Sequence, residues 1–222
     1  MKKKFYQLDS FTDKRFGGNP AAVVLNAEDL DKDQMQMIAR EMALSETAFV
    51  INSKVSDYDY EVRFFTPKQE VELCGHATIA TFSILAQKGI IKPTDNKIIV
   101  KQKTLAGILP VELYFNENNI SRIMMIQSKP KYCFTVNDIG EIASIMGISK
   151  DDVGLDGFKA EVMAYSTGLP DILLPVRSVD ILKKISPDLS KSTVQSHQSK
   201  ATTAHAAKKR SNGSLQCNPP LH

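Results

Sequence analysis

The sequence predicts an α+β protein whose strands surround one buried helix. Residues 75–89, which read GHATIATFSILAQKG, have apolar side chains distributed around the whole helical circumference. A helix without a polar face must be enclosed by other structure, and this one is too short to cross a bilayer. Segments typical of strands lie on both sides of it, and 222 residues suffice for one large domain or two small ones.

Around the central helix, the sequence predicts one more helix and seven strands. Residues 31–44 form an amphipathic helix, because Met35, Ile38 and Met42 share a face and Asp31 or Asp33 can cap its start. Bulky and β-branched runs predict the strands at 4–11, 21–25, 48–51, 60–65, 97–104, 108–115 and 121–127. Together these elements make a first lobe over residues 1–127.

A second and smaller unit is predicted over residues 128–189. A capping box at Asp138 and Glu141 starts a helix that Gly147 ends, and further strands and a helix follow at 161–167, 171–176 and 178–185. From residue 190 the composition changes to Ser, Thr, Lys, Gln, Ala and His with almost no branched apolar residue. Such a segment buries too little apolar surface to offset its ordering entropy, so we expect residues 190–222 to be a disordered basic tail.

Charge is divided unevenly along the chain. Of its 28 basic and 25 acidic residues, five basic and no acidic ones lie in 190–222, which leaves residues 1–189 with a formal charge of −2. A mildly acidic body argues against nucleic-acid binding. The three cysteines have spacings typical of neither a disulfide framework nor a zinc site, and no apolar signal-peptide segment follows residues 1–4. We therefore expect a cytoplasmic protein without a metal, a nucleic acid or a membrane as partner.

Five short motifs, in this order and at these spacings, resemble the PhzF-like isomerases and epimerases of phenazine biosynthesis. They are GNPA at 18–21, LSETA at 44–48, RFFTP at 63–67, LCGHAT at 73–78 and STGLPD at 166–171. The resemblance covers roughly residues 4–189 and implies the diaminopimelate-epimerase-like fold. That fold has two pseudo-symmetric lobes, each with a sheet wrapped around a central helix. Full-length members continue past residue 189, so the second lobe is expected to be incomplete here.

The resemblance also implies the catalytic residues. The acid/base glutamate of the family matches Glu46, and its active-site histidine matches His76. The implied reaction is a cofactor-independent proton transfer between carbons of a small carboxylated substrate, similar to dihydro-hydroxyanthranilate. A carboxylate that removes and returns a proton works best when partly buried, and Glu46 lies between a helix and an apolar strand. An exposed carboxylate at Glu46 and a structural histidine at His76 are the alternatives.

Substrate binding is expected near the start of the central helix. Its unpaired N–H groups and dipole favour an anionic group, and Gly75 lets a ligand approach the backbone. We therefore take Gly75, Ala77 and Thr78 as substrate-binding residues. Asn19, which follows two glycines, is expected to orient a polar substrate group, although a simple turn residue is the alternative.

Two other functions are compatible with the sequence. Cys74 would suit a cysteine-dependent amino-acid epimerase or racemase, because diaminopimelate epimerases use one thiol on each side of the substrate carbon. No second glycine-led helix start with a cysteine follows, so we expect Cys74 to be a small buried residue. The other alternative is a non-catalytic truncated product, since a reading-frame change near residue 190 would give this tail. Exposed faces of the incomplete lobe would then favour a homodimer.

Overall fold

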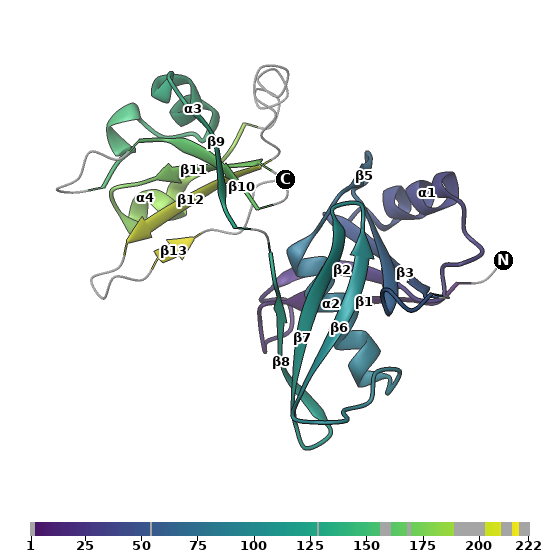
Figure 1. Cartoon of the computed structure of the whole chain (residues 1–222). Coiled ribbons are helices and arrows are strands. Elements are labelled where there is room, and N and C mark those ends of the chain that lie inside the picture. Colours follow the sequence, from purple (N-terminus) through teal and green to yellow (C-terminus); the bar gives the residue numbers. More distant parts are fainter. Residues whose placement is uncertain are drawn as a thin grey trace. The chain divides into compact units, whose positions relative to one another are not determined.

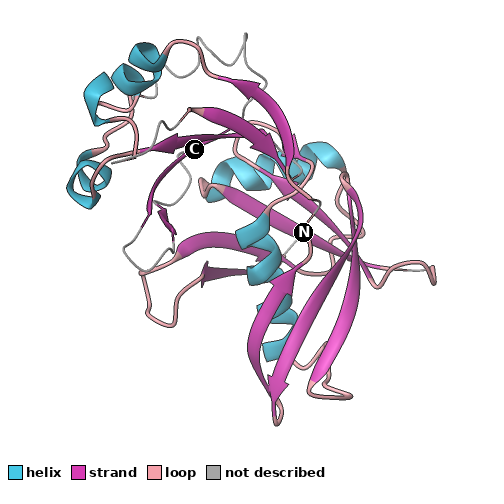
Figure 2. Cartoon of the chain, turned by 60° about the vertical axis from the view of Figure 1, so that its left-hand side comes forward, coloured by secondary structure: helices cyan, strands magenta, loops and turns pink. Residues whose placement is uncertain are grey.

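The computed structural model divides into two compact units, Met1–Gln127 and Ser128–His222 (Figure 1). Strands predominate over helices throughout the chain (Figure 2). The structure describes residues 3–53, 55–127, 129–155, 161–167, 170–188, 203–209 and 215–217, the last two ranges by their backbone alone.

The first unit is a mixed eight-stranded sheet around a buried helix. Most neighbouring strands are antiparallel, but β2 pairs in parallel with β3 and β4 with β6. Outside the main strand order, the two-residue strand β5 (Glu70–Val71) pairs with β4. The order along the rest of the sheet is β1 (Phe5–Ser10), β2 (Asn19–Val24), β3 (Glu46–Asn52), β4 (Tyr60–Phe65), β6 (Lys97–Thr104), β7 (Gly107–Asn116) and β8 (Asn119–Met125).

The central helix α2 (Gly75–Gln87) packs against β1, β2, β3 and β8 (Figure 1). Ala77, Ala80 and Phe82 are buried on different sides of it, as a helix enclosed by a sheet requires. The sequence predicts the helix as far as Gly89, but it ends at Gln87. Gly89 lies in the turn beyond, with a φ of 64° that favours glycine. In the described part of the chain, no helix is long and apolar enough to cross a membrane.

Helix α1 (Lys32–Met42) packs on β3 and β4. Asp31 is its N-cap and forms a capping box with Gln34, so it takes the capping role for which Asp31 and Asp33 were both candidates. Its buried residue Met35 belongs to one apolar cluster with Phe49 and Phe65. Phe49 and Glu46 are three residues apart on β3, and side chains at this spacing point to opposite faces of a strand. Glu46 therefore faces away from α1.

The second unit has a five-stranded sheet with its own apolar core. Ile142, Met146, Ala164 and Leu174 contribute to that core. Asp138 caps α3, and a Cβ on Gly147 would lie 2.7 Å from the carbonyl oxygen of Ser186. The remaining elements are β9 (Lys131–Thr135), α3 (Ile139–Ile145), the 3₁₀-helix η1 (Lys150–Asp152), β10 (Met163–Ser166), β11 (Pro170–Pro175) and α4 (Val179–Lys184).

Two segments of the expected disordered tail are strands in the structure. β12 (Thr203–Lys209) pairs in parallel with β11, and β13 (Leu215–Cys217) pairs with β12. For these segments the structure differs from the predicted disorder, and the rest of 190–222 lies outside the described residues. The physical reason is that β11 would be an edge strand without β12, and an edge strand offers backbone N–H and C=O groups to any extended segment. Composition alone carries no information about such pairing.

Candidate active site

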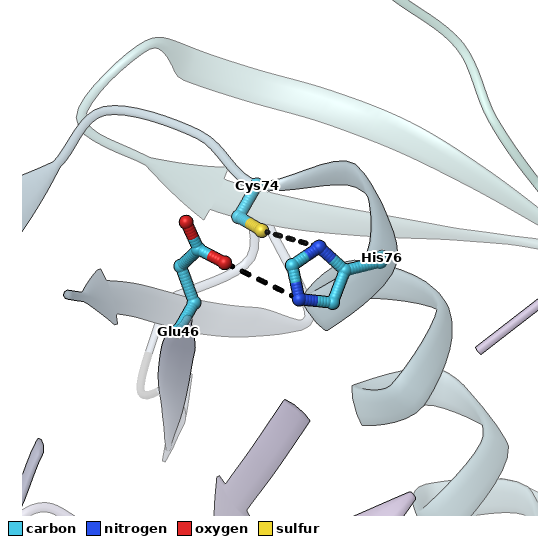
Figure 3. A group of neighbouring side chains, drawn as sticks. All are labelled: Glu46, Cys74 and His76. Atoms are coloured by element: carbon cyan, nitrogen blue, oxygen red, sulfur yellow. Dashed lines mark hydrogen bonds and ion pairs between the residues drawn. The ribbon is translucent and has the colours of Figure 1, made fainter. Parts of the chain in front are cut away.

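Glu46 and His76 meet at the start of the central helix. Glu46 is the first residue of β3, and His76 is in the first turn of α2. Each is only 6% exposed. The Nε2 atom of His76 lies 3.2 Å from Oε2 of Glu46 (Figure 3). A strand and a helix that are 30 residues apart in the sequence thus bring a buried carboxylate and a buried imidazole into contact.

Cys74 completes this cluster from the N-cap position of α2. Its Sγ atom lies 3.3 Å from Nδ1 of His76, whereas Glu46 contacts the other ring nitrogen (Figure 3). Burial, and after it the negative charge of Glu46, raises the pKa of the Cys74 thiol well above its ordinary value. The thiol is therefore protonated at neutral pH, which makes it a poor base or nucleophile. This argues against the cysteine-dependent mechanism.

Two serines that were not among the predicted site residues also contact His76. The hydroxyl of Ser45 lies 3.2 Å from Nε2, and the hydroxyl of Ser10 donates to the backbone carbonyl of His76 over 2.6 Å. Ser45 stands beside Glu46 in a motif that the sequence already singled out. Ser10 is 66 residues from His76 in the chain, and no local pattern connects the two.

The three residues predicted to bind substrate in the first turn of α2 differ in how accessible they are. Ala77 and Thr78 are both fully buried. The hydroxyl of Thr78 donates to the carbonyl of Cys74 over 2.8 Å, and its backbone N–H does so over 3.0 Å, so Thr78 stabilises the helix start. Gly75 is the open position, because a Cβ there would meet only the Gln127 side chain, at 3.9 Å. A ligand approaching the turn therefore reaches Gly75 before Ala77 or Thr78.

Asn19 lies at the same end of the sheet as the cluster. It opposes Ser10 in the β1–β2 pair, and Ser10 in turn contacts His76. The β2–β3 pair also places Ala21, two residues after Asn19, opposite Glu46. Gly18 permits the close approach of the loop before β2, because a Cβ there would lie 2.3 Å from the carbonyl oxygen of Ser10.

Glu46, Cys74 and His76 offer donor types that metal sites use, with ligand atoms within 4.8 Å of one another. Their arrangement does not fit a shared ion. Nδ1 of His76 faces the sulfur, whereas Nε2 faces the carboxylate, so neither nitrogen faces both other donors. We therefore assign no metal to the cluster.

Comparison with known sequences points to one family. Residues 8–217 match the family PhzC-PhzF, described as phenazine biosynthesis-like protein. The chain is 40% identical over 191 residues to an uncharacterised isomerase of Clostridium acetobutylicum, covering 84% of this chain and 60% of the relative. It is 36% identical over 180 residues to an uncharacterised isomerase of Bacillus subtilis, covering 81% of this chain and 58% of that relative. The chain thus spans about three fifths of these relatives.

Solved structures agree with the fold. A PhzF family phenazine biosynthesis protein of Bacillus anthracis superposes with a TM-score of 0.79 at 30% identity, covering 94% of this chain and 68% of that one. A probable proline racemase of Agrobacterium radiobacter superposes with a TM-score of 0.68 over 97% of this chain and 69% of that one, but at 10% identity, so it shares the fold alone. The predicted α+β fold class is confirmed.

Proposed function

The chain belongs to the phenazine biosynthesis-like (PhzF) family, as its motifs predicted, and from this premise we propose that Glu46 and His76 form the acid/base centre of an isomerase. The observation that carries the proposal is the buried contact of 3.2 Å between the Glu46 carboxylate and the His76 imidazole. All contacts of this pair described above lie within the first unit, 1–127. The two relatives named above carry the word isomerase in their names, which supports this reaction class.

The proposed reaction moves one proton and changes no oxidation state. Glu46 removes a proton from a substrate carbon, and the electrons of the broken C–H bond shift into the conjugated system. The same carboxyl group then returns the proton to another carbon, so the enzyme ends in its starting state. This balance requires no redox cofactor and no covalent intermediate. Burial suits the carboxylate to this role, because it excludes water that would compete for the proton.

The substrate proposed is a small carboxylate of the dihydro-hydroxyanthranilate class. The start of α2 supports this choice, because the N-terminus of a helix attracts an anionic group through its N–H groups and dipole. Gly75 leaves the approach to this terminus open. Asn19, at the same end of the sheet, is proposed to orient a polar substituent.

Replacement of the base tests the proposal directly. Glu46→Gln keeps the size of the side chain and its hydrogen bonding but removes the basic oxygen. We expect isomerisation of dihydro-hydroxyanthranilate, followed by NMR in D2O, to slow by roughly 10²-fold or more. Glu61→Gln is the matched control, because Glu61 is a carboxylate of the neighbouring strand β4 that pairs with Lys103 outside the cluster.

Three results would contradict the proposal. Near-normal turnover in a folded Glu46→Gln protein would show that another group carries the proton. A wild-type chain that is folded yet does not isomerise this substrate would favour a different substrate or the non-catalytic alternative. Racemisation of amino acids that Cys74→Ser abolishes would favour the thiol mechanism instead.

A further inference from the structure

The imidazole of His76 has a hydrogen-bonding partner at each nitrogen. Nε2 lies 3.2 Å from the Glu46 carboxylate, and Nδ1 lies 3.3 Å from the sulfur of Cys74 (Figure 3). All three side chains are buried. A ring nitrogen this close to a carboxylate oxygen must carry a hydrogen, because two lone pairs facing each other would repel. Nε2 is therefore the protonated nitrogen.

The opposite nitrogen defines the role of Cys74. In a neutral imidazole with hydrogen on Nε2, Nδ1 is an acceptor and needs a donor. The S–H group of Cys74 is at the right distance for this, and its contact with Nδ1 is already described above. We propose that Cys74 is a positioning residue that fixes the tautomer of His76 by donating its S–H to Nδ1. Burial, and after it Glu46, raises the pKa of the thiol, so the sulfur keeps a hydrogen that it can donate.

Sulfur suits this position better than a strong acceptor would. A carboxylate or carbonyl oxygen facing Nδ1 would favour a second ring hydrogen and hence an imidazolium ion. A thiol is a weak acceptor and offers little to an Nδ1–H group. Cys74 therefore favours a neutral ring that donates from Nε2 to Glu46.

The consequence for catalysis rests on the proposed function. A positively charged ring beside Glu46 would stabilise the carboxylate and weaken it as a base. A neutral ring orients the carboxylate through one hydrogen bond without adding that charge. Cys74 thus acts on the proton transfer through His76.

Ser45 is the group that would support the opposite tautomer. Its hydroxyl lies 3.2 Å from Nε2 and could donate to that nitrogen if it carried no hydrogen. That arrangement would place the Nε2 lone pair against the Glu46 oxygen, so we assign Ser45 as a second acceptor of the Nε2 hydrogen. Ser45→Ala is therefore a control that should leave the tautomer unchanged.

Nitrogen NMR of the full chain with ¹⁵N-labelled histidine tests the assignment. The His76 signals are identified by their loss in His76→Gln. At neutral pH we expect an Nδ1 without hydrogen that accepts a hydrogen bond, and an Nε2 with hydrogen. Cys74→Ser, which keeps a donor, and Ser45→Ala should preserve this pattern. Cys74→Ala should shift the Nδ1 signal toward that of a free acceptor nitrogen or populate a second form of the ring.

The outcomes are decisive in both directions. A wild-type Nδ1 that carries hydrogen, as the other tautomer or as imidazolium, overturns the proposal, and so does a Cys74→Ala spectrum identical to wild type. If Cys74→Ala fails to fold, the wild-type and Cys74→Ser spectra still decide, because both must show the Nε2–H form. These spectra need no substrate, so they test the tautomer even if the proposed function fails. Where turnover is measurable, Cys74→Ala should lower the turnover rate about tenfold, and Cys74→Ser should restore it. A loss of about tenfold is typical when a group that orients a functional histidine is removed.

Discussion

Cys74 and Cys133 differ in their surroundings and should therefore differ in reactivity. Cys74 is buried with a pKa raised well above the ordinary value by burial and by Glu46, whereas Cys133 is exposed on β9. Only thiolate reacts with iodoacetamide, and the reagent must also reach the sulfur, so the exposed Cys133 should be alkylated faster than Cys74. Cys74 should stay unmodified in the folded chain under conditions that label Cys133. Peptide mass spectrometry measures both sites, and Cys74 labelled as fast as Cys133 would contradict the raised pKa.

At the scale of single residues, the sequence identifies what its motifs contain and little else. Glu46, His76 and Cys74 stand in short motifs whose order carried the resemblance, so their proximity could be expected. Ser10 could not be found in this way, because its bond to His76 depends on how β1 pairs and curves around α2. Thr78 stands in the same motif as His76, yet its hydroxyl donates a hydrogen bond to the carbonyl of Cys74. A motif therefore gives the neighbourhood of a side chain but not its direction.

At the scale of elements, an ion pair between Arg63 of β4 and Glu70 of β5 holds these two strands together. Arg63 donates to both carboxylate oxygens of Glu70 over 2.7 and 2.9 Å, and Lys32 lies 3.3 Å from the same group. Burial alone would raise the pKa of Glu70, but the hydrogen bonds and charge of Arg63, and after them Lys32, outweigh it and lower the pKa. The stabilisation is therefore complete above the pKa of the unfolded chain and is lost as the pH falls through the lower folded value.

Glu70→Gln should reduce the free energy of unfolding by about 1–2 kcal/mol at neutral pH, the scale of a hydrogen bond to a charged group. It should also make stability less dependent on pH in the acid range than in wild type. Urea unfolding at neutral pH and in mild acid measures both effects. Glu61→Gln is the control, because its partner Lys103 is 43% exposed and such pairs contribute little. An equal loss in both variants would contradict a special role for the Arg63 pair.

The elements predicted best from the sequence are those with local signals. Helix α1 starts after Asp31, one of its two predicted caps, because capping and amphipathic spacing depend on residues close together in the sequence. Its end was less predictable, since Ala43 adopts a φ of 52° without the glycine that usually marks such a position. Strands β12 and β13 had no local signal at all. Their order comes from the edge of β11, which is a property of the folded sheet.

At the scale of the whole molecule, the two units have separate cores. The Glu46 cluster and the core around α1 lie in 1–127, and the core around α3 lies in 128–222. A fragment of residues 1–127 should therefore fold by itself and keep the His76 tautomer of the full chain. Circular dichroism and the histidine spectrum measure this. A fragment that unfolds would show that the first unit needs the second for stability.

Hydrogen exchange should rank the parts of the chain by how well hydrogen bonding and burial protect their backbone amides. Amides at 77–86 should exchange most slowly, because α2 is enclosed by the sheet of its unit. Amides at 163–174 should be intermediate. Those at 203–209 should exchange faster again, because β12 reads TAHAAKK and has no large apolar residue to anchor it beside β11.

Exchange of 203–209 at the rate of the denatured chain would support the disordered tail that the composition predicts. Protection equal to that of α2 would mean that the second unit depends on β12, because backbone pairing at a sheet edge alone cannot give so high an opening energy.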